Sequence, residues 1–120
     1  DNFFDRVIAI HILEHLPNLP CAVDEIARVL NKNGLLQIVI PCEGSFAYSL
    51  ARQISAKRIF EKKYKTSYDW FIKSEHVNLP VEIFVELKKK FTIVKKTYFP
   101  FPISVQFCNL CIALNLKLKT

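Results

Sequence analysis

Three histidines are the side chains in this sequence that could carry acid–base chemistry near neutral pH. Two of them bound the segment His11-Ile-Leu-Glu-His15, and the third is His76. Imidazole changes charge close to physiological pH, so a histidine can serve as a general base or as a metal ligand. We therefore predict that the catalytic groups are His11, His15 and His76. Each ring also has a structural alternative as a hydrogen-bonded polar group, and Glu14 would then orient His15 or face solvent.

The same segment offers a metal alternative, because His-x-x-Glu-His is also the signature of one group of zinc proteases. In a helix, His11, Glu14 and His15 would share one face and could hold a cation together. Pro17 would cut such a helix short, and a five-residue motif arises easily by chance. We therefore predict no metal site, and a cation at these three residues is the alternative.

Four cysteines raise the question of a disulfide or a second metal site. Cys108 and Cys111 spell a Cys-x-x-Cys pair, but residues three apart in a strand point to opposite faces. All four cysteines lie within or beside apolar stretches, and we expect no secretory leader. We predict buried, reduced cysteines and no disulfide.

Alternating strands and helices must position these side chains. Short apolar runs rich in β-branched residues predict strands buried on both faces of a parallel sheet. Helices are predicted where apolar residues recur every three or four positions after a capping Asn18 or Ser45, and after Asn78 and Pro80, which open the last helix. The predicted strands are residues 6–10, 35–40, 91–99 and 105–116, and the predicted helices are residues 18–30, 45–60 and 78–87.

The connections between these elements predict the topology. Residues 31–34 are expected to form a turn with left-handed backbone conformations, which joins the first helix to the second strand in a right-handed parallel crossover. Residues 61–72 are basic, aromatic and without clear periodicity, so we predict an irregular, lid-like connector. The join between the last two strands is short and contains Pro100 and Pro102, so these strands should pair antiparallel.

The composition allows one modest core and excludes several classes of protein. The chain has 120 residues, of which 51% are hydrophobic, and a formal net charge of +6. The apolar runs are far shorter than the roughly 20 residues that cross a bilayer, so we expect a cytoplasmic protein without a membrane span. The lysines are dispersed along the chain, so nucleic-acid binding is not predicted.

Three segments at fixed spacing resemble the central block of class I S-adenosylmethionine-dependent methyltransferases of the type 11/12-like group. They are Phe4-Asp-Arg-Val-Ile-Ala-Ile-His-Ile-Leu-Glu-His-Leu-Pro17, Ala22-Val-Asp-Glu-Ile-Ala-Arg-Val-Leu30 and Gly34-Leu-Leu-Gln-Ile-Val-Ile-Pro41. The resemblance is looser after Pro41. It implies the C-terminal half of a Rossmann-like α/β domain, with family strands four to seven in residues 1–120. Two parallel strands would precede a terminal antiparallel hairpin, with helices on the faces of the sheet.

The resemblance also implies where the cofactor lies. In an open parallel sheet, ligands bind beyond the carboxyl ends of the strands. By resemblance, the backbone of Ala9 and Ile10 would contact the methionine part of S-adenosylmethionine, and His11 would lie near the reacting methyl group. Arg28 would fix a loop or the region of Asp5 through a charged hydrogen bond.

The resemblance also offers a metal alternative that is better than the zinc-protease one. Some RNA 2′-O-methyltransferases and ubiquinone-pathway methyltransferases have Glu-x-x-Glu-His at this segment and bind a metal there. In this chain His11 replaces the first Glu.

The glycine-rich turn and the acidic residue that hold the rest of the cofactor in this family are not among these residues. The sequence has two glycines, Gly34 and Gly44, and no Gly-x-Gly turn. We therefore expect the 120 residues alone to bind S-adenosylmethionine weakly or not at all, and to be inactive. The alternative is a non-catalytic methyltransferase remnant that acts as a dimerisation or scaffold module.

The first strand would have an unpaired edge, which is a template for pairing with another chain. We predict a homodimer through this strand, or pairing with the missing N-terminal half of the domain. The methyl acceptor is not predicted and could be a small molecule, a lipid or a glycan. Aromatic residues that could line its site, or could pack over a helix instead, are Tyr48, Tyr64, Tyr68, Trp70 and Phe71.

Overall fold

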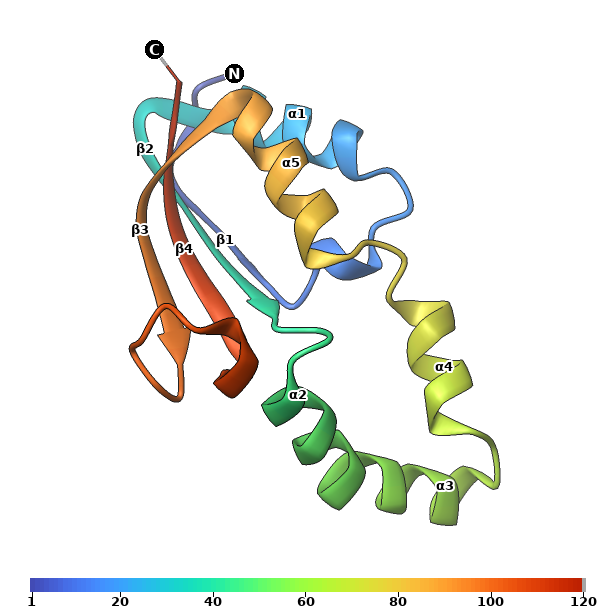
Figure 1. Ribbon diagram of the computed structural model, residues 1–120. Helices are drawn as coiled ribbons and strands as arrows, with labels where there is room; N and C mark the ends of the chain where they lie inside the picture. Colours follow the sequence, from blue (N-terminus) through green and yellow to red (C-terminus); the bar gives the residue numbers. More distant parts are fainter. Residues whose placement is uncertain (120) are drawn as a thin grey trace.

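The computed structural model describes residues 1–119 and contains one four-stranded sheet (Figure 1). In space the strands follow the order β1-β2-β4-β3. The first pair is parallel, while β4 lies antiparallel to both β2 and β3. This arrangement confirms the predicted α/β fold class, with two parallel strands followed by an antiparallel hairpin. The strands are β1 (Phe4–Ile10), β2 (Leu30–Pro41), β3 (Phe91–Phe99) and β4 (Cys111–Leu118).

Two helices, α1 (Leu19–Val29) and α5 (Pro80–Lys90), lie on the same face of the sheet (Figure 1). The Asn18 side chain accepts a hydrogen bond from the backbone N–H of Cys21 at 3.2 Å, which confirms the predicted cap of α1. The Glu82 carboxylate accepts from the N–H of Leu79 at the start of α5. Apolar side chains of both helices pack on the strands and form the core with Leu36, Ile38, Leu114 and Leu116.

A second group of helices extends away from the sheet (Figure 1). The segments α2 (Phe46–Ala51), η2 (Arg52–Lys57, π-helical) and α3 (Arg58–Tyr64) follow one another without a break, and α4 (Tyr68–Glu75) returns toward the sheet. Ser45 caps α2, as predicted, by accepting from the N–H of Tyr48 at 3.0 Å. The prediction of an irregular connector was wrong, because Ser67 caps a further helix there through the N–H of Trp70.

Strand β1 differs from the prediction of a strand buried on both faces. Ala9 is buried in the core, whereas Ile8 and Ile10 are 58% and 57% exposed. The reason is that α1 and α5 cover one face of the sheet, while the face that carries Ile8 and Ile10 has no helix over it (Figure 1). The strand pairs with β2 along one side. Its other edge is unpaired within residues 1–119, as the sequence led us to expect.

The turn predicted at residues 31–34 is part of β2 and has no left-handed residue. The register jumps there, since Phe4 pairs with Leu30 and Arg6 pairs with Leu35. Gly34 is needed for close approach, because an added Cβ would lie 2.7 Å from Leu30 Cδ1. The left-handed glycine of this chain is Gly44, at φ 81°, in the loop after β2.

The last strand begins later than predicted. Residues 100–110 form a loop that includes a short 3-10 helix, η3 (Gln106–Cys108), so the join is longer than its prolines suggested. Asn109 is buried and holds this loop, since its side chain donates to the carbonyls of Ile103 and Val105. The pairing of β3 with β4 is antiparallel, as predicted.

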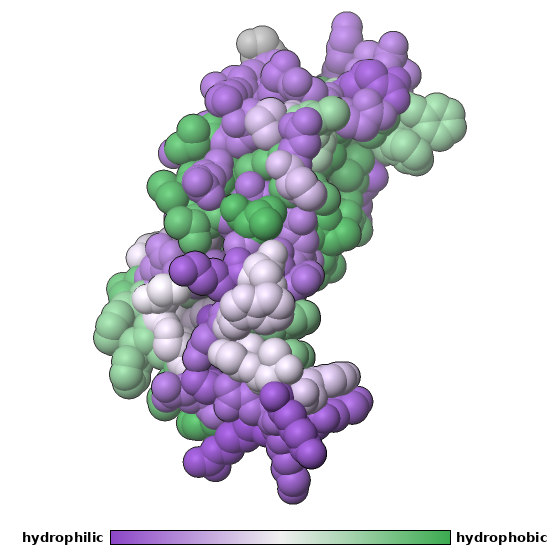
Figure 2. All heavy atoms as spheres, turned by 90° about the vertical axis from the view of Figure 1, so that its right-hand side faces the viewer, coloured by the Kyte–Doolittle hydropathy of each residue, from purple (hydrophilic) through white to green (hydrophobic). Residues whose placement is uncertain are grey.

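The molecule measures 48 × 30 × 20 Å, with the sheet half and the α2–α4 group at opposite ends. Hydrophilic side chains gather at the end formed by α3, and hydrophobic side chains cover the flanks of the sheet half (Figure 2). No helix in the described part of the chain has the length and apolar character to span a membrane.

Candidate functional site

The candidate site begins where β1 ends. His11 is the first residue beyond the strand and has a left-handed backbone, with φ 49°. Its N–H still donates to the carbonyl of Val39 at 3.0 Å, which continues the ladder with β2 by one bond. The chain then turns out of the sheet into a 3-10 helix, η1 (Leu13–His15). This turn places the predicted catalytic segment beyond the carboxyl end of a parallel strand, where open α/β sheets bind their ligands.

Glu14 is buried at the centre of this turn, with 1% of its surface exposed. Its Oε1 lies 3.2 Å from Nδ1 of His11, and its Oε2 has no hydrogen-bond partner. The two roles predicted for Glu14 were therefore wrong, because it contacts His11 instead of His15 and does not face solvent. Burying a carboxylate oxygen without a hydrogen-bond partner costs free energy, so we expect Glu14 to have a functional role.

The connection between α4 and α5 is fastened to this turn. The Asn78 side chain donates to the carbonyls of Leu13 at 2.8 Å and Leu16 at 2.7 Å. The N–H groups of Val77 and Asn78 both donate to the backbone carbonyl of Glu14. These four bonds bring His76, which is remote in sequence, against the η1 turn.

His15 and His76 consequently lie ring to ring. Their centroids are 4.6 Å apart in an edge-to-face arrangement, and Nδ1 of His15 lies 2.8 Å from the backbone carbonyl of Glu75. That carbonyl accepts a hydrogen bond from Nδ1–H, which leaves Nε2 of His15 as the ring atom with a free lone pair. Ligand atoms of Glu14, His15 and His76 all lie within 4.8 Å of one another.

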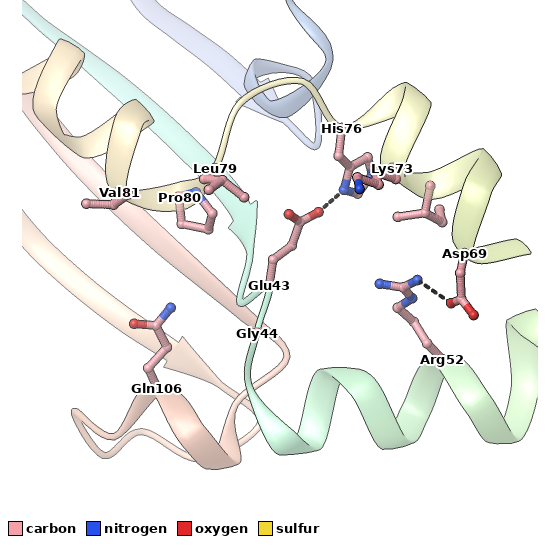
Figure 3. Close-up of a pocket in the computed structure, with 11 residues that line it drawn as sticks. Glu43, Gly44, Arg52, Asp69, Lys73, His76, Leu79, Pro80, Val81 and Gln106 are labelled. Carbon is pink, nitrogen blue, oxygen red and sulfur yellow. Dashed lines mark hydrogen bonds and ion pairs between the residues drawn. The ribbon is translucent and has the colours of Figure 1, made fainter.

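Glu43 completes the cluster from the loop after β2. Its carboxylate contacts Nδ1 of His76, and both side chains are largely buried (Figure 3). Burial, reinforced by the nearby His15 ring, lowers the pKa of His76 below its ordinary value. Burial therefore favours the neutral form of the His76 ring, which has a lone pair for a proton or a cation.

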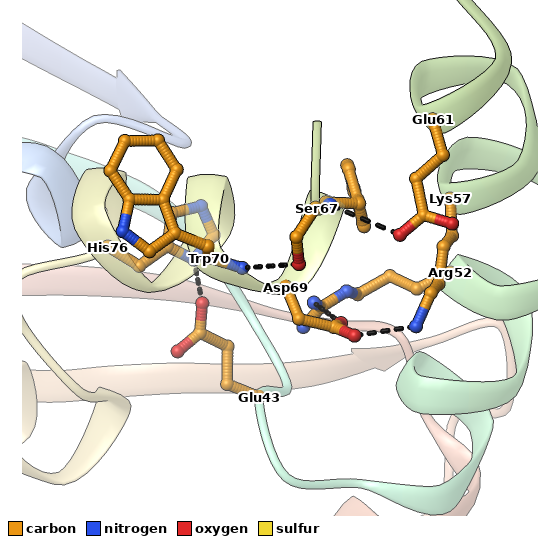
Figure 4. A network of polar contacts seen from close by, with 9 residues as sticks. Glu43, Arg52, Lys57, Glu61, Ser67, Asp69, Trp70 and His76 are labelled. Atoms are coloured by element: carbon orange, nitrogen blue, oxygen red, sulfur yellow. Dashed lines mark hydrogen bonds and ion pairs between the residues drawn. The ribbon is translucent and has the colours of Figure 1, made fainter. Parts of the chain in front are cut away.

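A pocket of about 540 Å³ opens beside this cluster, between the η2 segment, α4 and the start of α5 (Figure 3). Glu43 and His76 line its inner side, and Arg52 and Lys73 add positive charge to its wall. Arg52 points from the π-helical turn toward Asp69, whose carboxylate also binds Lys57 at 2.6 Å (Figure 4). This network ties α4 to the η2 segment and so fixes the outer wall of the pocket.

A smaller pocket of about 320 Å³ lies on the other side of His11. His11, Tyr48 and Arg52 line it together with Cys111 at the start of β4. Burial raises the pKa of Tyr48, so its hydroxyl keeps its proton at neutral pH. The Arg52 guanidinium lies 5.6 Å from the Tyr48 ring centroid, which holds both side chains in place.

The other aromatic residues of this region pack mostly on one another. Phe60 of α3 contacts the rings of Tyr64, Tyr68 and Phe71, with centroids 4.8 to 5.3 Å apart. Trp70 is 65% exposed. Of the aromatic residues named from the sequence, Tyr48 is the one that lines a pocket beside His11.

The structure brings the three predicted histidines together, although they come from two distant segments. The predicted cofactor contacts Ala9 and Ile10 immediately precede His11, with the side chain of Ala9 in the core and that of Ile10 on the open face. Sequence reasoning missed Glu43 and Asn78. Glu43 carried a usable signal, because it follows β2 much as His11 follows β1 at the carboxyl ends of two parallel strands.

Arg28 and the cysteines complete the comparison with the sequence predictions: Arg28 holds the segment before β1, though through Asp1 and not Asp5, and three of the four cysteines are less buried than predicted. Arg28 pairs with Glu25 and Asp1, while Asn31 reaches Asp5 in its place. All four cysteines are free, but Cys42 alone is fully buried. The Cys-x-x-Cys pair is half-buried, because Cys108 lies in η3 before the strand begins. Cys42 is the inert thiol, since burial raises its pKa to about 11.

Comparisons with known proteins agree with this geometry. Residues 1–38 match the sequence family described as a methyltransferase domain, which spans β1, the η1 turn, α1 and most of β2. Over these residues the chain is similar to class I S-adenosylmethionine-dependent methyltransferases. No curated protein matches it significantly.

Solved structures extend the similarity in fold to nearly all residues of the chain. The N-methyltransferase NodS from Bradyrhizobium japonicum, in complex with S-adenosyl-L-homocysteine, matches with a TM-score of 0.58 and 14% identity over 99% of this chain. The PH0226 protein from Pyrococcus horikoshii matches 99% of it with a TM-score of 0.66 and 15% identity. A Thermotoga maritima protein, described as a possible histamine N-methyltransferase, matches 99% of it with a TM-score of 0.58 and 20% identity.

The chain covers 48%, 56% and 58% of these three structures, respectively. It therefore spans about half the length of the solved structures it matches.

Proposed function

We propose that this chain supplies the C-terminal half of a methyltransferase domain that transfers the methyl group of S-adenosylmethionine to an acceptor in the pocket beside His11. The observation that supports this most is the position of His11 and Glu43, each just beyond the carboxyl end of one of two parallel strands. The ligand crevice of open α/β sheets lies at this end. The adjoining pockets give an acceptor room.

In this proposal the cofactor lies along the end of β1. The backbone of Ala9 and Ile10 contacts its methionine part, and His11 lies beside the reacting methyl group. The adenosine part is held by the other half of the domain, because a glycine-rich turn is not among the 120 residues. The isolated chain is accordingly a weak binder of S-adenosylmethionine and inactive.

His11 is the best placed of the three histidines to act as a base. Its side chain is half-exposed and lines the smaller pocket, and Glu14 holds its Nδ1. A carboxylate on Nδ1 fixes the ring and leaves Nε2 to accept a proton from the acceptor. Nδ1 of His15 is hydrogen-bonded to the Glu75 carbonyl, and His76 is buried against Glu43. In this proposal these two rings help to position the site and do not act as the base.

The cofactor is tested first by binding, because the acceptor is unidentified. S-adenosyl-L-homocysteine is titrated into the natural full-length polypeptide that contains these residues, and amide chemical shifts are recorded. The largest shifts are expected at Ala9, Ile10 and His11, with little change in α3. Binding that leaves the end of β1 unperturbed, or no binding at millimolar ligand, overturns the proposal.

A methyltransferase remnant that serves as a dimerisation or scaffold module is the second candidate. The exposed Ile8 and Ile10 beside an unpaired strand edge favour it, since such an edge pairs readily with another chain. This candidate predicts a dimer by light scattering. It also predicts no affinity for S-adenosyl-L-homocysteine when the other half of the domain is present.

A further inference from the structure

The cluster of Glu14, His15 and His76 has features that methyl transfer does not require. Its ligand atoms, one carboxylate oxygen and two ring nitrogens, lie within 4.8 Å of one another. In tetrahedral zinc sites with metal–ligand distances of about 2.1 Å, the ligand atoms lie roughly 3.4 Å from one another. Small side-chain rotations would bring the three ligand atoms to this spacing. We propose that these three residues bind a divalent transition-metal ion such as Zn²⁺, with Glu43 beside them.

The unbalanced charge of the cluster is the first argument. Glu14 is buried with Oε2 unpartnered, and Glu43 is largely buried against His76. Within residues 1–119, neither carboxylate pairs with a lysine or an arginine. The two carboxylates thus lie close together without a lysine or arginine partner, and buried carboxylates are normally paired or bound to a metal.

The orientation of the rings is the second argument. Metal-binding histidines usually donate their other ring N–H to a carbonyl or a carboxylate, which fixes the ring and aims the free nitrogen. His15 does this through Nδ1 and the Glu75 carbonyl at 2.8 Å. The Glu43 carboxylate contacts Nδ1 of His76. Glu14 has an outer partner of the same kind in His11, whose Nδ1 contacts Oε1 and leaves Oε2 free to bind a cation.

The rigidity of the backbone is the third argument. The Asn78 side chain and two backbone N–H groups join the loop after α4 to the η1 turn by four hydrogen bonds. The ligands thus come from two segments that are fastened together before any ion binds. A cation there would lie at the inner side of the large pocket, because Glu43 and His76 line it. Its open coordination positions would be available to an oxygen atom of a pocket ligand.

Nitrogen and oxygen ligands in this mixture suit Zn²⁺, Fe²⁺, Co²⁺ and Mn²⁺ better than Ca²⁺, which prefers oxygen alone. The experiment therefore uses the natural full-length polypeptide, purified without a histidine tag and without chelator. Its metal content is measured by mass spectrometry, after which the stripped protein is titrated with Zn²⁺ and with Co²⁺. Wild type is expected to bind one ion more per chain than the His15→Ala variant.

A graded series of variants separates ligands from their surroundings. His15→Ala, His76→Ala and the isosteric Glu14→Gln should each weaken Zn²⁺ binding by more than about 100-fold, the upper range for loss of an outer-shell partner. His11→Ala, which removes such a partner, should weaken it by about 10- to 100-fold. Glu25→Gln changes an exposed carboxylate elsewhere and should bind like wild type.

Circular dichroism confirms that each variant is folded, and Glu14→Gln keeps the test valid if an alanine variant unfolds. Equal Zn²⁺ affinity in wild type and Glu14→Gln, or no Zn²⁺ binding at millimolar concentration, overturns the proposal. Metal binding is measured without S-adenosylmethionine, so the outcome is independent of methyl transfer. A protein that binds the ion but no S-adenosyl-L-homocysteine would sustain this inference and refute the proposed function.

Discussion

At single positions of this chain, neighbouring atoms and the local backbone conformation determine which side chains are tolerated. Its two glycines show the contrast, because they are needed for different reasons. Gly34 has an ordinary backbone but no room for a Cβ, which would meet Leu30 Cδ1 at 2.7 Å and the carbonyl oxygen of Asn31 at 2.9 Å. Gly44 has open space around it and a left-handed φ of 81°.

The two glycines should therefore respond differently to substitution. Gly34→Ala is expected to lower the free energy of unfolding by about 1–3 kcal/mol, as overpacking usually does. Gly44→Asn should change it by less than about 0.5 kcal/mol, because asparagine adopts the left-handed conformation and meets no neighbour. Urea unfolding of both variants measures the difference. Equal losses at the two sites would contradict this account.

Hydrogen bonds between elements, more than the elements themselves, assemble the candidate site. The η1 turn and the loop between α4 and α5 are far apart in sequence, and Asn78 joins them. Asn109 does the same for the loop between β3 and β4, and Ser45 donates to its carbonyl at 2.8 Å. Each of these residues satisfies several backbone groups at once, so its loss leaves more than one group unpaired.

Asn78→Ala is expected to lower the free energy of unfolding by about 1–3 kcal/mol, because the partly buried carbonyls of Leu13 and Leu16 lose their donor. Asn31→Ala serves as the matched control, since its bond to Asp5 is exposed and should cost less than about 1 kcal/mol. Thermal unfolding compares the two variants. A larger loss in Asn31→Ala would show that the loop is not held by Asn78.

At the scale of the whole molecule, the sheet is covered on one face and open on the other. Leu36, Ile38 and Ile40 of β2 are buried under the helices, while Gln37 and Val39 between them are half-exposed. The solved structures that this chain matches are about twice its length. We therefore expect the open face and the β1 edge to be covered in the working protein, by the other half of the domain or by a second copy.

Ile8 and Val85 test this expectation as a matched pair, because both are 58% exposed in the structure. In the natural polypeptide, Ile8→Lys should lower the free energy of unfolding or of association by at least about 2 kcal/mol, because a charge would enter a covered apolar surface. Val85→Lys on α5 should stay within about 0.5 kcal/mol. Light scattering shows whether a second copy is the partner. Near-neutral effects of both variants would mean that the open face meets water.

The sequence by itself determined the family, the parallel pair of strands, the helix caps at Asn18 and Ser45, and the segment that carries His11. These depend on local patterns, namely apolar periodicity, capping residues and a motif at fixed spacing. The incorrect predictions also came from local patterns. Residues 61–72 have no clear periodicity, yet they fold into parts of α3 and α4. Pro100 and Pro102 suggested a short connection before β4, which is a loop of residues 100–110.

Only the tertiary structure decided that Glu14 is buried against His11, that His76 lies against His15, and that Glu43 enters the same cluster. These contacts join residues up to 62 positions apart in sequence, and no local pattern encodes them. Their physical cause is a loop fastened by Asn78 to the turn after β1. The chemistry of this protein therefore resides in side chains that the sequence supplied and that only folding placed together.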